Sequence, residues 1–244
     1  MVKKIAVVAV LLAVVAGAWW WWSNRVTGEP PAVAATLSAK HTVAFVTVQD
    51  LDGITSTVLE ALNQVPEADR PAPVKMVTDS AARSSALGFD PATVEGWQSI
   101  GVDPKPGATV VIDGRMLADM EPVPALLVKI TDRAKLLAFL EQRAGQKPEI
   151  DSSAKPLEKL TAGGETLMLG ERQGYTAILL GPARKQAKVI EGFTAFLNDG
   201  SGDLGGQDTL ARAFDGAETL YVGAYLSGQG LLSLFEGEAA KGLG

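Results

Sequence analysis

The feature of the sequence that most limits its fold is an apolar run at the N-terminus. Two lysines, Lys3 and Lys4, precede it, and residues 5–18 contain no charged or hydrogen-bonding side chain. A helix rises about 1.5 Å per residue, so residues 5–22 would span roughly 27 Å, close to the hydrocarbon thickness of a membrane. The run predicts a transmembrane anchor over residues 1–25.

Four consecutive tryptophans follow this run: Trp19, Trp20, Trp21 and Trp22. Tryptophan prefers the interface between hydrocarbon and water, and lysines favour the cytoplasmic side. Lys3 and Lys4 therefore predict a cytoplasmic N-terminus. We expect a single-pass protein of the inner (cytoplasmic) membrane, with its main domain periplasmic or extracellular.

A cleaved signal peptide is the alternative interpretation of the same segment, with cleavage after Ala18. Cleavage would leave a mature chain that begins with four tryptophans, an apolar patch without a role. We therefore prefer a retained anchor. The chain has no cysteine, which excludes a lipoprotein anchor, disulfide bonds and thiolate metal sites.

The charge of the exported part narrows the classes of partner. All 28 acidic residues follow Arg25, whereas three of the 22 basic residues lie within residues 1–25, so the remainder carries 19 − 28 = −9. This balance argues against binding to nucleic acid or to anionic lipid surfaces. The expected partners are the membrane, through the N-terminal helix, and a protein partner or a second copy of the chain.

The rest of the chain divides into three parts. Residues 26–39, rich in proline, glycine and alanine, predict a linker. Residues 40–216 alternate strand and helix patterns and predict an exported α+β domain. The pattern of residues 41–54 recurs weakly from Glu218, so residues 217–244 are interpreted as the truncated start of a second repeat.

The hydrophobic patterns predict an N-terminal transmembrane helix followed by a mixed, mainly antiparallel sheet with helices packed on one face. The strands are expected at residues 41–48, 108–113, 125–130, 157–161, 166–169, 176–180 and 219–226. The helices are expected at residues 54–62, 74–87, 91–100, 132–143 and 182–197. Asp90 and Asp132 are the predicted caps of two of these helices.

One segment carries a resemblance. Leu87-Gly-Phe-Asp-Pro, followed by Trp97-Gln-Ser-Ile-Gly-Val-Asp-Pro-Lys-Pro-Gly-Ala, resembles bacterial membrane-anchored envelope proteins of unknown function. The resemblance covers roughly residues 36–236. It implies an exported α+β domain that is often duplicated along the chain, and it implies no activity and no catalytic residues.

Candidate site residues are few. Asp199, Ser201 and Asp203 place oxygen ligands at alternate positions, as a calcium loop does, but the glycine and glutamate of an EF-hand are missing, and a flexible loop is the preferred interpretation. His41 is the only histidine, which leaves no histidine-based metal site and little basis for a catalytic triad. No cofactor is expected.

Two weaker candidates remain. Asp113, Asp119 and Glu121 cluster in the sequence as paired carboxylates do in glycosidases, although any acidic domain offers such clusters. Trp97 offers a face for a sugar, although its helical spacing from Val94 favours the core.

The function expected from these observations is a membrane-tethered envelope binding or scaffolding module with no recognisable catalytic site. A carrier of lipid or another hydrophobic ligand in the periplasm is one alternative, and an enzyme of unknown type is the other.

Overall fold

The structure of the 244-residue chain is a computed structural model that describes residues 31–49, 51, 53, 84, 88–105, 107–118, 121–181, 186–208, 210 and 222–227. No helix within these ranges is long and apolar enough to cross a membrane. The predicted anchor at residues 1–25 lies outside them, as do nearly all of the two helices predicted between residues 54 and 87 and most of residues 217–244.

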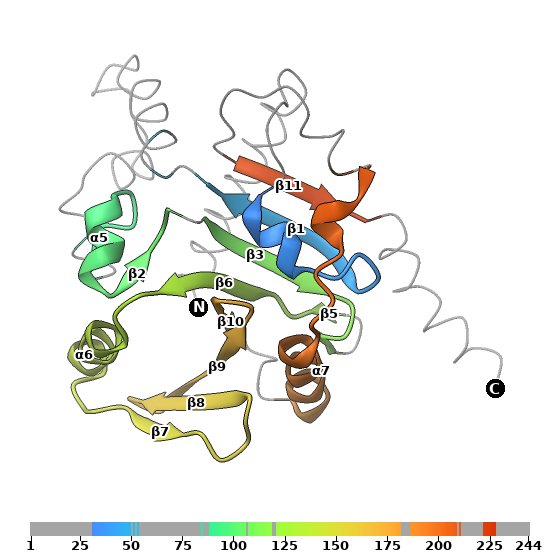
Figure 1. The fold of residues 1–244 in the computed structure, drawn as a ribbon. Coiled ribbons are helices and arrows are strands. Elements are labelled where there is room, and N and C mark those ends of the chain that lie inside the picture. The colour runs from blue at the N-terminus through green and yellow to red at the C-terminus, as the bar shows by residue number, and fades with distance from the viewer. Residues whose placement is uncertain are drawn as a thin grey trace, which may run out of the picture.

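A nine-stranded sheet forms the centre of the fold (Figure 1). Its order is β11-β1-β3-β6-β10-β9-β8-β7, with β2 also paired to β6. The strands are β1 (Thr42–Val48), β2 (Val102–Asp103), β3 (Ala108–Asp113), β6 (Ala125–Ile130), β7 (Glu149–Asp151), β8 (Leu157–Ala162), β9 (Glu165–Arg172), β10 (Tyr175–Leu179) and β11 (Val222–Leu226). A separate two-stranded ribbon pairs β4 (Leu117–Ala118) with β5 (Glu121–Pro122).

Every strand pair among the described residues is antiparallel. The α+β class and the mainly antiparallel character of the sheet are therefore confirmed, whereas the parallel pairing implied by a mixed sheet is not found among the described residues. The strands predicted at residues 108–113 and 125–130 have the bounds of β3 and β6. The expected meander is β8-β9-β10, and its second turn has Gln173 and Gly174 at positive φ, as a tight hairpin turn requires.

Helices cover both faces of this sheet, so the prediction that they pack on one face was wrong. On one face lie α7 (Ala187–Asn198) and two 3-10 helices, η1 (Ala32–Thr36) and η4 (Leu204–Gly206). On the other lie α5 (Val94–Ser99) and α6 (Arg133–Ala144). The reason lies in the nearly continuous apolar sequence of β6, which leaves hydrophobic side chains on both of its faces.

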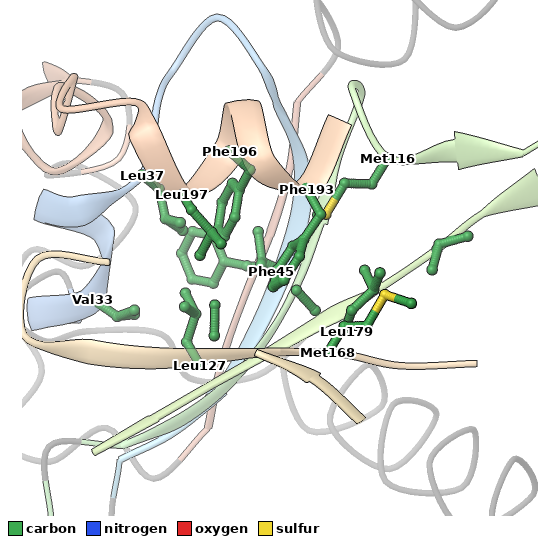
Figure 2. Packing of buried hydrophobic residues seen from close by; sticks show 14 of the residues in the cluster. Val33, Leu37, Phe45, Met116, Leu127, Met168, Leu179, Phe193, Phe196 and Leu197 are labelled. Atoms are coloured by element: carbon green, nitrogen blue, oxygen red, sulfur yellow. The ribbon is translucent and has the colours of Figure 1, made fainter. Parts of the chain in front are cut away.

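The larger core lies between the sheet and α7 (Figure 2). Phe193, Phe196 and Leu197 of α7 meet Phe45 and Leu127 of the sheet, and all five are buried. The smaller core on the opposite face centres on Val128 and on the ring of Phe89. Its aromatic residues pack edge to face, with centroids 5.1 Å apart for Phe89–Trp97 and 5.7 Å apart for Phe89–Phe139.

The domain begins earlier than predicted. Residues 31–39, part of the expected linker over residues 26–39, belong to the larger core, because Val33, Ala34 and Leu37 are fully buried. Small apolar residues with a neighbouring proline resemble a linker in sequence, yet here they fill the space between the sheet and the end of α7. Val33, Ala34 and Leu37 therefore belong to the folded domain, which was predicted to begin at residue 40.

The helix ends differ in detail from their predictions. Asp132 caps α6 as expected, because its side chain accepts a hydrogen bond from the backbone N–H of Lys135. Thr93, rather than Asp90, caps α5, since its hydroxyl accepts from Gly96. Helix α7 begins at Ala187 rather than at Pro182.

Candidate functional site

A groove with a volume of about 600 Å³ lies on the part of the sheet formed by β8, β9 and β10. The end of β6, the first residue of α6 and the loop between β7 and β8 complete its wall. Its volume lies within the range of roughly 300–1,000 Å³ that is usual for ligand pockets. The groove is therefore the candidate binding site of the domain.

Strand register determines which side chains reach the groove. Glu158 of β8 stands opposite Leu169 of β9, and Glu171 of β9 stands opposite Thr176 of β10. Directly paired residues share a face of the sheet, and so do residues two apart. These four side chains therefore lie on one face, opposite to Met168, which enters the larger core. The groove lies on the face away from α7.

An ion pair between Arg133 and Glu158 joins the start of α6 to β8 in the groove wall. The side chain of Arg133 is 48% exposed and that of Glu158 is 15% exposed. A pair as exposed as this contributes at most about 1 kcal/mol to stability. Its effect on the groove is to hold the start of α6 beside β8.

A second set of charges lies near the turn between β9 and β10. Lys155 and Glu171 line the groove and both are exposed, and neither side chain has a hydrogen bond or ion pair to another described residue. Leu157 pairs with Gly170, which places Lys155 and Glu171 at the same end of the β8–β9 ladder. Tyr175 pairs with Arg172, so its side chain lies on the other face and packs against the larger core, where burial raises the pKa of its phenol.

The groove can therefore bind a ligand through ionic, hydrogen-bonding and apolar contacts together. It presents two cations, two carboxylates, hydroxyl groups and apolar surface from Ile130 and Pro156. Within the described part of the chain, no three His, Cys, Asp or Glu side chains cluster closely enough to hold a metal ion. No arrangement of nucleophile, base and orienting acid is present among the groove residues.

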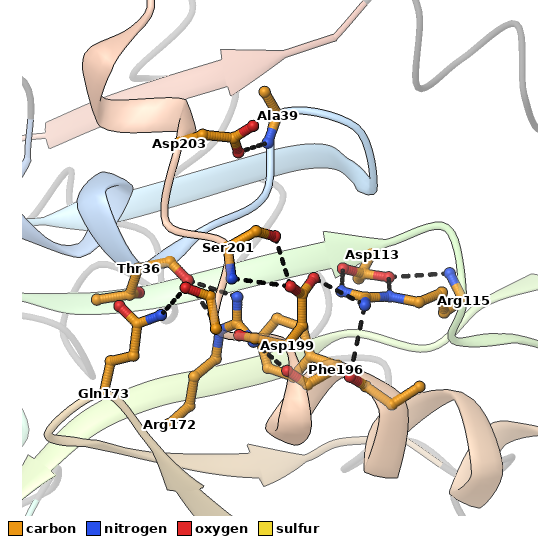
Figure 3. Close-up of polar contacts among 12 residues, drawn as sticks. Thr36, Ala39, Asp113, Arg115, Arg172, Gln173, Phe196, Asp199, Ser201 and Asp203 are labelled. Atoms are coloured by element: carbon orange, nitrogen blue, oxygen red, sulfur yellow. Dashed lines mark hydrogen bonds and ion pairs between the residues drawn. The ribbon is translucent and has the colours of Figure 1, made fainter.

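A second polar assembly, which we call the arginine cluster, consists of Arg172, Arg115, Asp113 and Asp199 (Figure 3). Arg172 is 1% exposed. Its Nε and Nη2 donate to the carbonyl of Thr36 at 2.9 and 2.5 Å, and its Nη1 donates to the carbonyl of Asp199 at 2.8 Å and to that of Phe196. Burial lowers the pKa of Arg172, but arginine remains charged in proteins.

The guanidinium of Arg172 also stacks on the ring of Phe196, with 4.2 Å between Cζ and the ring centroid. Its hydrogen bonds join three segments: the end of η1, the last turn of α7 and the residue that follows α7. A cation at the carbonyl end of a helix is favourable because those carbonyls carry partial negative charge. Arg172 therefore fastens η1 to α7 across the larger core.

Arg115 forms the other half of the cluster. It binds Asp113 through two bonds of 2.8 and 2.7 Å and reaches Asp199 at 2.8 Å. Burial acts to lower the pKa of Arg115, but the two carboxylates outweigh it and raise the pKa above its ordinary value. Asp113, a candidate acid from the sequence, is fully buried in this pair. Asp119 and the side chain of Glu121 lie outside the described residues.

The calcium candidates are engaged by protein donors. Asp199 accepts hydrogen bonds from the backbone and hydroxyl of Ser201 and from Arg115. Asp203 accepts from the backbone N–H of Ala39 at 2.8 Å. Burial acts to raise the pKa of Asp199, yet these hydrogen bonds outweigh it and hold the pKa at about 2. The loop predicted to be flexible is folded against residues 35–39, which favours a structural role for all three residues.

The remaining candidates have local structural roles. His41 is half-buried before β1, and its carbonyl accepts from Gly114 at 2.8 Å. Trp97 donates its indole N–H to the carbonyl of Pro91 at 2.9 Å and packs in the smaller core. Sequence reasoning missed both Arg172 and the groove. The only local signal for Arg172 was a charged residue in a strand just before a tight turn.

The fold and the groove define an α+β domain built on an antiparallel sheet that is covered on both faces. Comparison with protein-family models, with curated proteins and with solved structures gives no match.

Proposed function

We propose that the protein is a membrane-tethered module of the cell envelope that binds another protein through the groove on β8, β9 and β10. The observation that supports this most is the groove itself, with its volume of about 600 Å³ and its mixture of charged, hydroxyl and apolar side chains. The apolar run at residues 5–22 supports the tether, with the N-terminus cytoplasmic and the domain in the periplasm.

The lipid-carrier alternative receives less support from the groove. A carrier needs a cavity lined mainly by apolar side chains, because burying an unpaired charge beside an acyl chain is costly. Arg133, Lys155, Glu158 and Glu171 all line this groove. The enzyme alternative is also less favoured, because Glu158 is ion-paired and Glu171 is exposed, so neither carboxylate has the buried setting that tunes a catalytic acid.

Site-specific photocrosslinking in native membranes tests the binding proposal. A photoreactive amino acid at Ser152, on the groove wall, is expected to give one discrete crosslinked protein, identified by mass spectrometry. The same group at Lys188, exposed on α7 on the opposite face of the sheet, is the matched control. Equal crosslinking from both positions, or bound lipid in place of a protein, would contradict the proposal.

The tether is tested separately. The full chain is expected to remain in the membrane pellet after alkaline carbonate extraction, whereas a variant without residues 1–25 is expected in the soluble fraction. The intact mass of the extracted chain should include all residues from Met1. A mass reduced by residues 1–18 would show a cleaved signal peptide and exclude the anchor.

A further inference from the structure

The charges of the groove form two pairs that differ in one respect. Arg133 and Glu158 bind each other, whereas the side chains of Lys155 and Glu171 have no hydrogen bond or ion pair to a described residue. Both of these unpaired charges lie at the end near the β9–β10 turn. The groove therefore offers one free cation and one free anion, next to apolar surface.

This arrangement selects among the chemical classes of ligand. A polyanion would meet the carboxylates of Glu158 and Glu171, and a polycation would meet Arg133 and Lys155, so like-charge repulsion disfavours both. An acyl chain would leave the same charges desolvated. A ligand with one acidic group, one basic group and apolar surface complements all the side chains. A polypeptide segment with one acidic, one basic and several apolar side chains has this chemistry.

We infer that the groove binds an extended internal segment of a partner protein that carries an acidic side chain for Lys155, a basic side chain for Glu171 and apolar side chains for Ile130 and Pro156. This inference rests on the proposed function and specifies its ligand. The segment needs no free terminus, because the groove supplies a counter-charge for each of the two side chains. Thr176, which pairs with Glu171, adds a hydroxyl group beside it.

The probe for a first test is a fluorescent tetrapeptide with one lysine, one glutamate and two leucines, capped at both ends. Its binding to the full chain in lipid nanodiscs is measured by fluorescence anisotropy. Saturable binding is expected. Peptides with two lysines or two glutamates should bind more weakly, by roughly fivefold, because a solvent-exposed ion pair is worth up to about 1 kcal/mol. Equal binding of all three peptides, or no binding, would overturn the inference.

Charge-reversal variants test the residues. Lys155→Glu and Glu171→Lys should each weaken binding of the mixed-charge peptide by about tenfold, since each replaces an attraction with a repulsion. The double variant K155E/E171K restores one charge of each sign and should recover most of the affinity. Lys188→Glu and Glu191→Lys, both exposed on α7, are the matched controls and should bind normally. If the double variant does not recover affinity, the assignment of Lys155 and Glu171 as the residues that bind the peptide charges is wrong.

Two further outcomes separate this inference from the proposed function. If a peptide binds only when its termini are uncapped, the ligand is a free oligopeptide, and the inference that it is an internal segment of a protein is wrong. A partner that crosslinks to Ser152 equally well in wild type and in K155E would leave the proposed function standing and refute the charge pairing. Absence of any crosslinked partner would refute both.

Discussion

Replacing Arg172 by methionine tests how η1 is fastened to the domain. Methionine fills a similar length and is apolar, so it removes the charge and the four hydrogen bonds without opening a large void. The carbonyls of Thr36, Phe196 and Asp199 then lose their donors. A buried polar group without a partner costs about 1–3 kcal/mol, and part of the loss at Asp199 is recovered by water. We expect a total loss of about 3–5 kcal/mol.

Thermal unfolding of the full chain in nanodiscs, followed by circular dichroism, measures this loss. For a domain of this size, 1 kcal/mol shifts the melting temperature by about 2–4 °C, so R172M should melt about 10 °C lower. Arg172→Lys keeps the charge but loses the planar set of five donors, so its melting temperature should lie between those of the wild type and R172M. Arg133→Met removes an exposed ion pair and should change stability by less than about 1 kcal/mol.

Hydrogen exchange locates the effect. The backbone N–H of Leu204 donates to the carbonyl of Leu37, which lies just after η1, so its protection reports whether η1 remains in place. In R172M this amide should exchange faster while the amides of β3 remain protected at low temperature. A loss of less than 1 kcal/mol, or unchanged exchange at Leu204, would refute the reasoning.

Two further predictions concern α7. A Cβ at Gly192 would lie 1.9 Å from the carbonyl oxygen of Arg115, so Gly192→Ala should displace α7 and destabilise the domain by about 1–3 kcal/mol in chemical unfolding, whereas Gly200→Ala, with no atom within 4 Å, should be close to neutral. The pKa of Asp199 is about 2, below the ordinary value of 3.8, so its stabilisation is complete at pH well above 3.8 and is lost as the pH falls toward 2. Asp199→Asn should therefore reduce the difference in unfolding midpoint between pH 5 and pH 2, by up to about 2 kcal/mol; an unchanged difference would show that Asp199 does not carry this dependence.

The strands were the part of the fold that could be predicted from sequence. Both β3 and β6 consist mainly of apolar and β-branched residues between turn residues, and their bounds follow from that pattern. The cap at Asp132 was predictable for the same reason, since it depends only on residues up to Lys135. Interactions within one turn or one strand leave a signal in the local sequence.

The features that escaped prediction depend on residues far apart in the chain. Arg172 contacts Thr36, 136 positions earlier, and nothing local distinguishes it from an exposed arginine. The groove combines residues between Ile130 and Thr176 that come from β6, α6, the loop between β7 and β8, and β8 to β10. Residues 31–39 were assigned to a linker because small apolar residues are ambiguous until a surface is available to cover them.

The inclusion of residues 31–39 in the core has a consequence for the reach of the domain. If the proposed anchor ends at residue 25, five positions, residues 26–30, separate it from Pro31, which is buried in the domain. A fully extended chain covers at most about 3.5 Å per residue, so these five residues span no more than about 18 Å. An anchor at residues 1–25 would therefore hold the folded domain within about that distance of the lipid surface, and a partner would have to reach the domain there.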